Sequence, residues 1–221
     1  VVDALTSSGR IDRIAIAAPP DVRGPIGEAL AGVDGWSFRD VAGSPASSAM
    51  AAMEEAPEGR GLLVTTCDHA LLSAAMVRSF LDTATKTDAA AACVERSTYE
   101  ARFPGSKRTF IRLKDLSFSG ANLFWFAGAR ARGLADFWRG LEANRKNPLA
   151  MARAIGALTA LSYLTGSMTK AGLEATIRKR TKVGVRLVPL SAAEAAIDVD
   201  KPEDKQLVER ILATRSAGQS A

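Results

Sequence analysis

The chain is poor in the residue types that several kinds of functional site require. Its 221 residues include one histidine and two cysteines, and only 6% are aromatic. A single histidine excludes mechanisms that need two, such as those of HExxH zinc hydrolases. Cys67 and Cys93 are too few for a disulfide framework or a multi-thiolate zinc site, which predicts a reducing, cytoplasmic location. Because few aromatic residues lie among the basic ones to stack on bases, we expect no nucleic-acid partner.

Long apolar runs and targeting signals are also missing. The longest apolar stretch, 149–164, is interrupted by Arg153 and is too short for a membrane-spanning helix. The first residues lack the basic start and apolar run of a signal peptide. They also lack an initiator Met, so we expect the chain to begin inside a longer reading frame.

The remaining composition is that of a globular protein built on aliphatic side chains. Hydrophobic residues make up 47% and charged residues 24%, and the length suits a single domain over residues 1–221. The net charge of +5 suits a ligand that carries phosphate.

Apolar runs of strand length alternate with helical segments. Strands are predicted at 11–18, 36–41, 61–68, 88–95, 109–113, 121–127, 183–190 and 196–199. Helices are predicted at 1–8, 25–30, 46–56, 73–85 and 202–214, with a turn at 117–120 and a frayed tail after 214. The continuous apolar run at 61–68 is typical of a central strand covered on both faces. The alternation predicts an α/β fold with parallel neighbouring strands.

Residues 128–179 lack strand signals and predict a helical insertion. One apolar face recurs there at steps of three and four residues, through Met151, Ala154, Ile155, Leu158 and Leu161. We expect this face to pack on the domain or on a second copy in a homodimer. The alternative is a membrane surface, which the basic run 178–182 would favour.

A carboxylate follows the predicted strand 61–68. In open α/β sheets ligands bind beyond the carboxyl ends of the strands, where Asp68 could hold Mg²⁺ against a ligand phosphate. Asp68 could equally cap the next helix. His69 is expected to be a polar turn residue, with a place in the site as the alternative.

A second acidic segment lies near the end of the chain. Asp198 and Asp200 are two residues apart, so they share a face if the backbone is extended. Their mutual repulsion calls for a cation or a hydrogen-bond network. Glu203 and Asp204, just after Pro202, suit the first turn of a helix.

Together these segments resemble the MobA-like nucleoside-triphosphate (NTP) transferases. The run TTCDHALL at 65–72 is similar to that family's T-x-D-x-P-L-L, and AIDVDKPED at 196–204 is similar to its D-V-D-T-P-E-D. Residues 103–109 and 118–124 resemble acceptor-side segments of one branch. The resemblance implies a Rossmann-like, three-layer, mostly parallel sheet of the glycosyltransferase-A type. It also implies transfer of a nucleotidyl group from an NTP to a phosphorylated small-molecule acceptor, with release of pyrophosphate.

The resemblance also implies roles for particular residues. Asp68 and Asp200 would bind Mg²⁺ and act in catalysis, and Asp68 would also contact the nucleotide. The other implied site residues are Ser47 and Ser48 near the base and Gly120 and Asn122 near the acceptor. Lys107 and Arg108 lie in a Gly- and Ser-containing loop and are candidates to grip the acceptor phosphate, with a solvated basic turn as the alternative.

The family's glycine-rich loop, L-x-A-G-G-x-x-x-R, has no counterpart in this sequence. In the family this loop follows a first strand that lies between the strands matching 11–18 and 61–68. We therefore expect about 30 to 40 further residues upstream, and a chain that is nearly inactive without them. Two further departures are Ala70 in place of proline and Lys201 in place of threonine.

Two other functions remain open. A sugar transferase on the same fold is one, because Asp198-Val199-Asp200 forms a D-x-D motif. A nucleotide-binding protein without turnover is the other.

Overall fold

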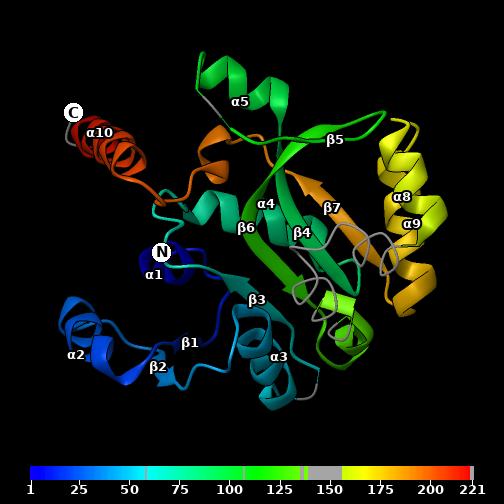
Figure 1. The fold of residues 1–221 in the computed structure, drawn as a ribbon. Coiled ribbons are helices and arrows are strands. Elements are labelled where there is room, and N and C mark those ends of the chain that lie inside the picture. Colours follow the sequence, from blue (N-terminus) through cyan, green and yellow to red (C-terminus); the bar gives the residue numbers. More distant parts are fainter. Residues whose placement is uncertain (58, 107, 135–136, 139–155, 220–221) are drawn as a thin grey trace.

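The computed structural model describes residues 1–57, 59–106, 108–134, 137–138 and 156–219, and strands and helices alternate along it (Figure 1). The first part runs α1 (Val2–Thr6), β1 (Ile14–Ala17), α2 (Pro20–Ala29), β2 (Trp36–Arg39), α3 (Pro45–Glu55), β3 (Leu62–Thr65), α4 (Ala74–Ala84) and β4 (Ala89–Glu95). The second runs α5 (Arg96–Arg102), β5 (Ile111–Arg112), β6 (Ser117–Phe126), the 3₁₀ helix η1 (Gly128–Ala131), α8 (Ala157–Leu164), α9 (Lys170–Thr181), β7 (Val185–Pro189), the 3₁₀ helix η2 (Ala193–Ala196) and α10 (Pro202–Gln219).

The main sheet has the strand order β3–β6–β4–β7, with β5 paired to β6. Strands β3, β4 and β7 point the same way, because β3 and β4 both run antiparallel to β6 and β7 runs parallel to β4. The predicted α/β fold with a mostly parallel sheet is therefore confirmed, and β6 is the long strand that runs against the others.

Helices cover both faces of this sheet, which gives three layers (Figure 1). Successive side chains of β4 alternate between the two faces, as the pleat of a strand requires. Ala90, Ala92 and Val94 face one core together with Phe80 of α4, whereas Cys93 faces another with Met168. Many of these side chains are small, which lets the helices pack close to the strand.

A separate two-stranded sheet lies beside the main one. Strands β1 and β2 pair in parallel, with Ile14 opposite Trp36. In the part of the chain that the structure describes, no strand ladder joins β1 to β3. Strands β1 and β3 are therefore not hydrogen-bonded neighbours.

Several sequence predictions about local structure are wrong. The strand from the run 61–68 lies at the edge of the main sheet and is only half buried, because it pairs with β6 alone. Residues 117–120 belong to β6, and the chain instead turns at 113–116. Residues 193–196 form the 3₁₀ helix η2 in place of a strand beginning at Ala196. Helix α10 continues to Gln219 through the segment expected to fray.

The helical region at 128–179 contains η1, α8 and α9, with no strand among its described residues. Leu158 and Leu161 on α8 are 84% and 56% exposed, so they do not pack on the domain as expected. Met151, Ala154 and Ile155, the rest of the predicted apolar face, lie outside the described residues.

Candidate active site

The first acidic residue lies just beyond the end of β3. Asp68 is half buried, and its carboxylate accepts a hydrogen bond from the Thr66 hydroxyl. It does not cap α4, because the Ser73 hydroxyl accepts the Met76 N–H at 3.3 Å and fills that position. The helix-cap interpretation of Asp68 is therefore wrong, and its carboxylate remains partly open to solvent.

The second acidic segment runs directly against the first. The Val199 N–H donates to the Asp68 carbonyl at 3.0 Å, which joins residues 131 positions apart in the chain. Ile197, only 2% exposed, anchors this segment in the core. Both acidic segments were identified in the sequence as candidate parts of the site, and in the structure they are hydrogen-bonded neighbours.

The start of α10 follows these residues. The Asp204 carboxylate accepts the N–H groups of Asp200 and Lys201, at 3.3 and 3.0 Å. The predicted helix-start role of Asp204 is thus confirmed. The carboxylate of Asp200 itself takes no part in this capping, and Asp200 is exposed.

Asp198 is the most enclosed of the three aspartates, with a side chain 14% exposed. Its Oδ2 pairs with Arg108 Nη2 at 3.1 Å, while its buried Oδ1 has no partner among the described residues. Burial raises the pKa of Asp198, the Arg108 guanidinium opposes that shift, and the charges of Asp68 and Asp200 add to it. The charges of both Asp68 and Asp200 therefore reach the carboxyl group of Asp198.

Arg108 has a structural task that its sequence context did not reveal. In addition to the ion pair between its Nη2 and Asp198, Arg108 donates from Nε to the Ser119 hydroxyl at 2.8 Å. Its guanidinium lies 5.9 Å from the centre of the Tyr99 ring. Arg108 is therefore not a solvated residue of a basic turn, which was the alternative interpretation. Asp198 and Arg108 are 90 positions apart, so no local pattern could have predicted the pair. Lys107, its predicted companion, lies outside the described residues.

His69 lies in the turn that follows β3, as expected, and its side chain is fully buried there. Its Nδ1 lies 3.3 Å from the Thr65 hydroxyl. Burial lowers the pKa of His69 to about 4, although the Asp68 charge next to it acts in the opposite direction. The imidazole is consequently neutral at pH 7 and packs as part of the core behind Asp68.

Strand β6 brings its two predicted residues close to this site. Asn122 is half buried, and its backbone contributes a hydrogen bond to the environment of His69. Gly120 is exposed, pairs with Cys93 in the ladder and has open space where a side chain would begin.

The two predicted serines lie in the first turn of α3 and bond to residues just before that helix. Ser48 bonds to both backbone groups of Ala42, accepting its N–H at 2.9 Å and donating to its carbonyl at 3.2 Å. The N–H and hydroxyl of Ser47 bond to the Ser44 hydroxyl. These hydrogen bonds are local, and none of them is to an aspartate of the site.

The residues present fit a divalent cation of the magnesium type. Carboxylate oxygens are hard donors, and a cation would offset the repulsion among the three aspartates. Across the described ranges no three His, Cys, Asp or Glu side chains form a complete metal cage. Mg²⁺ rarely needs one, because it commonly binds one or two carboxylates together with phosphate oxygens and water.

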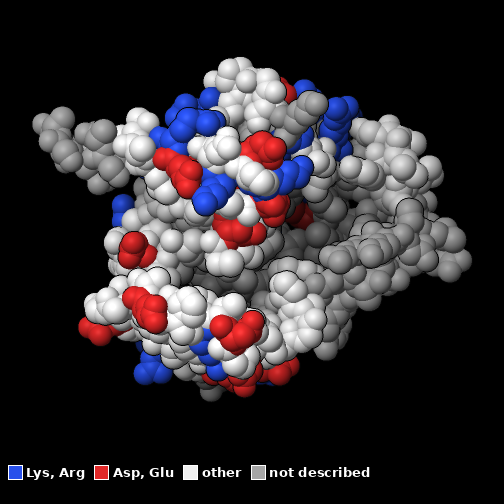
Figure 2. Space-filling model, turned by 60° about the vertical axis from the view of Figure 1, so that its left-hand side comes forward, with Lys and Arg blue, Asp and Glu red and all other residues white. Residues whose placement is uncertain are grey.

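The molecular surface around this region is mixed in charge. On the face shown in Figure 2, acidic and basic side chains lie side by side over the upper half, above a hollow that separates it from the lower half. That face is therefore not uniformly basic. None of the described helices is both long and apolar enough to cross a membrane.

The fold defines the class of protein first. The three-layer, mostly parallel sheet is of the glycosyltransferase-A type, which similar solved structures share. The model of the MobA-like NTP transferase domain matches residues 1–183, so the chain belongs to that family.

Solved structures agree with this assignment. A protein described as a hypothetical transferase from Thermus thermophilus is 29% identical, with a TM-score of 0.77, over 92% of this chain and 83% of that one. Two more share the fold. The 4-diphosphocytidyl-2C-methyl-D-erythritol synthase of Anaerococcus prevotii is 12% identical (TM-score 0.60; 96% and 86% covered). The 2-C-methyl-D-erythritol 4-phosphate cytidylyltransferase of Thermus thermophilus is 15% identical (TM-score 0.53; 95% and 86% covered). No curated protein matches the chain.

Proposed function

We propose that this protein transfers a nucleoside monophosphate from an NTP to a phosphorylated small molecule and releases pyrophosphate. The observation that carries the proposal is the meeting of the two acidic segments through the Val199–Asp68 hydrogen bond. Asp68 lies within residues 1–183, which match the NTP transferase domain, and Val199 follows that range. One structural neighbour is named as a 2-C-methyl-D-erythritol 4-phosphate cytidylyltransferase, which supports a phosphorylated acceptor.

Asp68 and Asp200 would hold Mg²⁺ with phosphate oxygens of the donor. When bound, the ion supplies positive charge that offsets the negative charge of the triphosphate. Both carboxylates are accessible, since Asp68 is half buried and Asp200 is exposed. Asp198 is better suited to positioning, because Arg108 already neutralises one of its oxygens.

The acceptor would lie beside β6. Gly120 leaves open space there, and Asn122 follows it on the same strand. Arg108 holds Asp198 and Ser119 in place through hydrogen bonds. Lys107, its neighbour in sequence, is a candidate to bind the acceptor phosphate. Ser47 and Ser48 remain candidates for the base end of the nucleotide.

The reaction is an in-line displacement at phosphorus. An acceptor phosphate oxygen forms a bond to the α-phosphorus, while the bond from that phosphorus to the oxygen bridging to the β-phosphate breaks. Pyrophosphate leaves with that bridging oxygen. The protein's contribution is to orient both phosphates and to exclude competing geometries.

A sugar transferase is the second candidate, because the structure places the D-x-D motif of Asp198 and Asp200 beside Asp68. Sugar-nucleotide donors in place of NTPs would then be consumed. The two free thiols, Cys67 exposed and Cys93 buried, suit a reducing compartment such as the cytoplasm for either reaction.

Substitution of the aspartates tests the proposal. Asp68→Ala and Asp200→Ala should each lower Mg²⁺-dependent release of pyrophosphate at least ~100-fold, with little change in melting temperature. Asp82→Ala is the matched control, because Asp82 is an exposed aspartate that pairs with Arg10 outside the site. Full activity of either site variant, with the same Mg²⁺ dependence, would contradict the assignment.

A further inference from the structure

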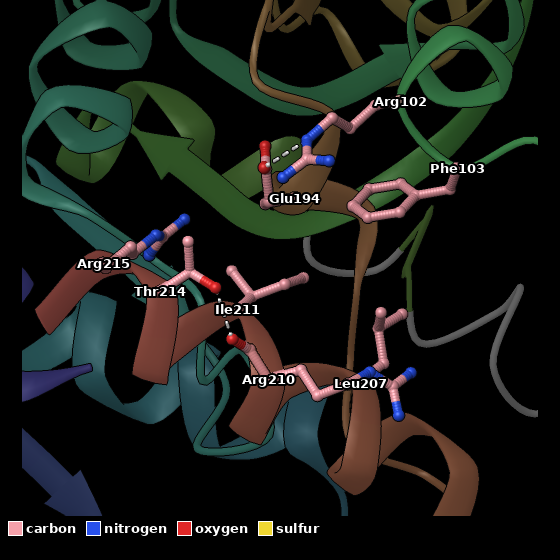
Figure 3. Close-up of a pocket in the computed structure, with 8 residues that line it drawn as sticks. All are labelled: Arg102, Phe103, Glu194, Leu207, Arg210, Ile211, Thr214 and Arg215. Carbon is pink, nitrogen blue, oxygen red and sulfur yellow. Dashed lines mark hydrogen bonds and ion pairs between the residues drawn. The ribbon is translucent and has the colours of Figure 1, made fainter. Parts of the chain in front are cut away.

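A pocket of about 430 Å³ lies apart from the aspartates, between the end of α5, η2 and one face of α10 (Figure 3). Its volume is within the range of small-molecule sites. Asp68, Asp198 and Asp200 do not line it. The side chains that do are Arg102, Phe103, Glu194, Leu207, Arg210, Ile211, Thr214 and Arg215.

The pocket carries a net positive charge from three arginines and one glutamate. Glu194 is mostly buried and pairs with Arg102, whose Nε lies 3.2 Å from Glu194 Oε1. That pair leaves the charges of Arg210 and Arg215 without a carboxylate partner among the described residues. Guanidinium groups bind phosphate and carboxylate through paired hydrogen bonds, so an anion suits this lining.

Two of the arginines are already held in place. Arg215 Nη1 donates to the Leu71 carbonyl at 3.1 Å, which fixes the guanidinium without neutralising it. The Arg102 guanidinium lies 5.2 Å from the centre of the Phe103 ring. Groups fixed in advance lose less conformational entropy when a ligand binds.

An apolar wall completes the pocket. Phe103 and Ile211 are both 9% exposed, and Leu207 is half buried on the same face of α10. Figure 3 shows Phe103 and Leu207 on one side of the space, Ile211 nearer its centre, and the three arginines at separate places around it. A ligand with an apolar body would bury carbon against this wall while its anionic end reaches the arginines.

We propose that this pocket binds a phosphate monoester with a compact apolar body. The inference goes beyond the proposed transfer reaction, since it needs neither an NTP nor the aspartates. The negative charge of the phosphate suits the net positive charge of the lining, and its apolar body suits Phe103, Leu207 and Ile211.

Phenyl phosphate is a suitable probe, with inorganic phosphate as its comparison, titrated calorimetrically into the full chain at low salt. Phenyl phosphate should bind more tightly than inorganic phosphate because of the apolar wall. Arg210→Gln, which removes no hydrogen bond of its side chain, should weaken phenyl phosphate about 10-fold. Arg178→Gln makes the same charge change on exposed α9 and should leave binding unchanged.

Leu207→Ser separates the two parts of the site. It should remove the advantage of phenyl phosphate over inorganic phosphate while inorganic phosphate still binds. Three results would overturn the proposal: no heat of binding for either probe, equal losses in Arg210→Gln and Arg178→Gln, or loss of binding in Asp68→Ala with none in Arg210→Gln. The last result would place the probe in the reaction site.

Discussion

At the scale of single residues, His69 links the core to the acidic site. It is fully buried next to Asp68, and burial lowers its pKa to about 4 from 6.5. In the unfolded chain the imidazole takes up a proton as the pH falls through 6.5, whereas in the folded protein it does so only near 4. The unfolded state therefore binds more protons between these values, and stability falls as the pH falls.

We expect acidification from pH 7.5 to 4.5 to cost the wild-type protein about 2 to 3 kcal/mol more than it costs His69→Gln. Urea unfolding of both proteins at the two pH values measures the free energies of unfolding. Because all other titratable groups are the same in the two proteins, the difference between their losses reports on His69 alone. Equal losses in the two proteins would show that His69 is not buried in its neutral form.

At the scale of secondary-structure elements, the start of α4 tests whether Asp68 has a structural role as a helix cap. Ser73 caps this helix and Asp68 does not. Ser73→Ala should therefore cost about 1 kcal/mol of stability, while Asp68→Ala should cost less. Thermal or denaturant unfolding of both variants decides the matter, and a larger loss for Asp68→Ala would assign the cap to Asp68.

Helix α8 provides a second test at this scale. Its side chains at Leu158 and Leu161 are exposed, so their replacement by glutamate removes little packing. We expect the double variant to keep the melting temperature of the wild type. A clear drop in melting temperature, or a change of oligomer in size-exclusion chromatography, would show that this face is covered by a second copy.

Elements whose signals are local were predicted well. Ser44 before Pro45 marks the start of α3, and its hydroxyl accepts the Ser47 N–H as that pattern requires. The place of β6 was not predictable in this way. It lies between β3 and β4 although it follows both in sequence, and strand order depends on contacts that single runs do not encode.

The candidate site likewise contains residues that the sequence predicts and contacts that it does not. Asp68 and Asp200 stand out because acidic residues follow apolar segments, and both were identified from the sequence. The ion pair of Arg108 with Asp198 was not, since it depends on the packing of the 103–109 loop against the η2–α10 connection. The buried position of His69 depends on Asn122 of β6 and Ala195 of η2, both of which are far from it in sequence.

At the scale of the whole molecule, two sheets lie side by side around the candidate site. The β1–β2 pair and the main sheet share no ladder in the described ranges. The upstream strand and glycine-rich loop that the family resemblance implies stay a prediction.

The central claim is transfer of a nucleotidyl group, and the fate of each phosphate of the donor tests it most directly. The protein is incubated with Mg²⁺, a phosphorylated acceptor and an NTP radiolabelled at either the α- or the γ-phosphorus. The account predicts that the α-label enters the acceptor product and the γ-label leaves in pyrophosphate, and that Asp68→Ala stops both. Transfer of the γ-label to the acceptor, or transfer from a sugar nucleotide with the NTP untouched, would contradict it.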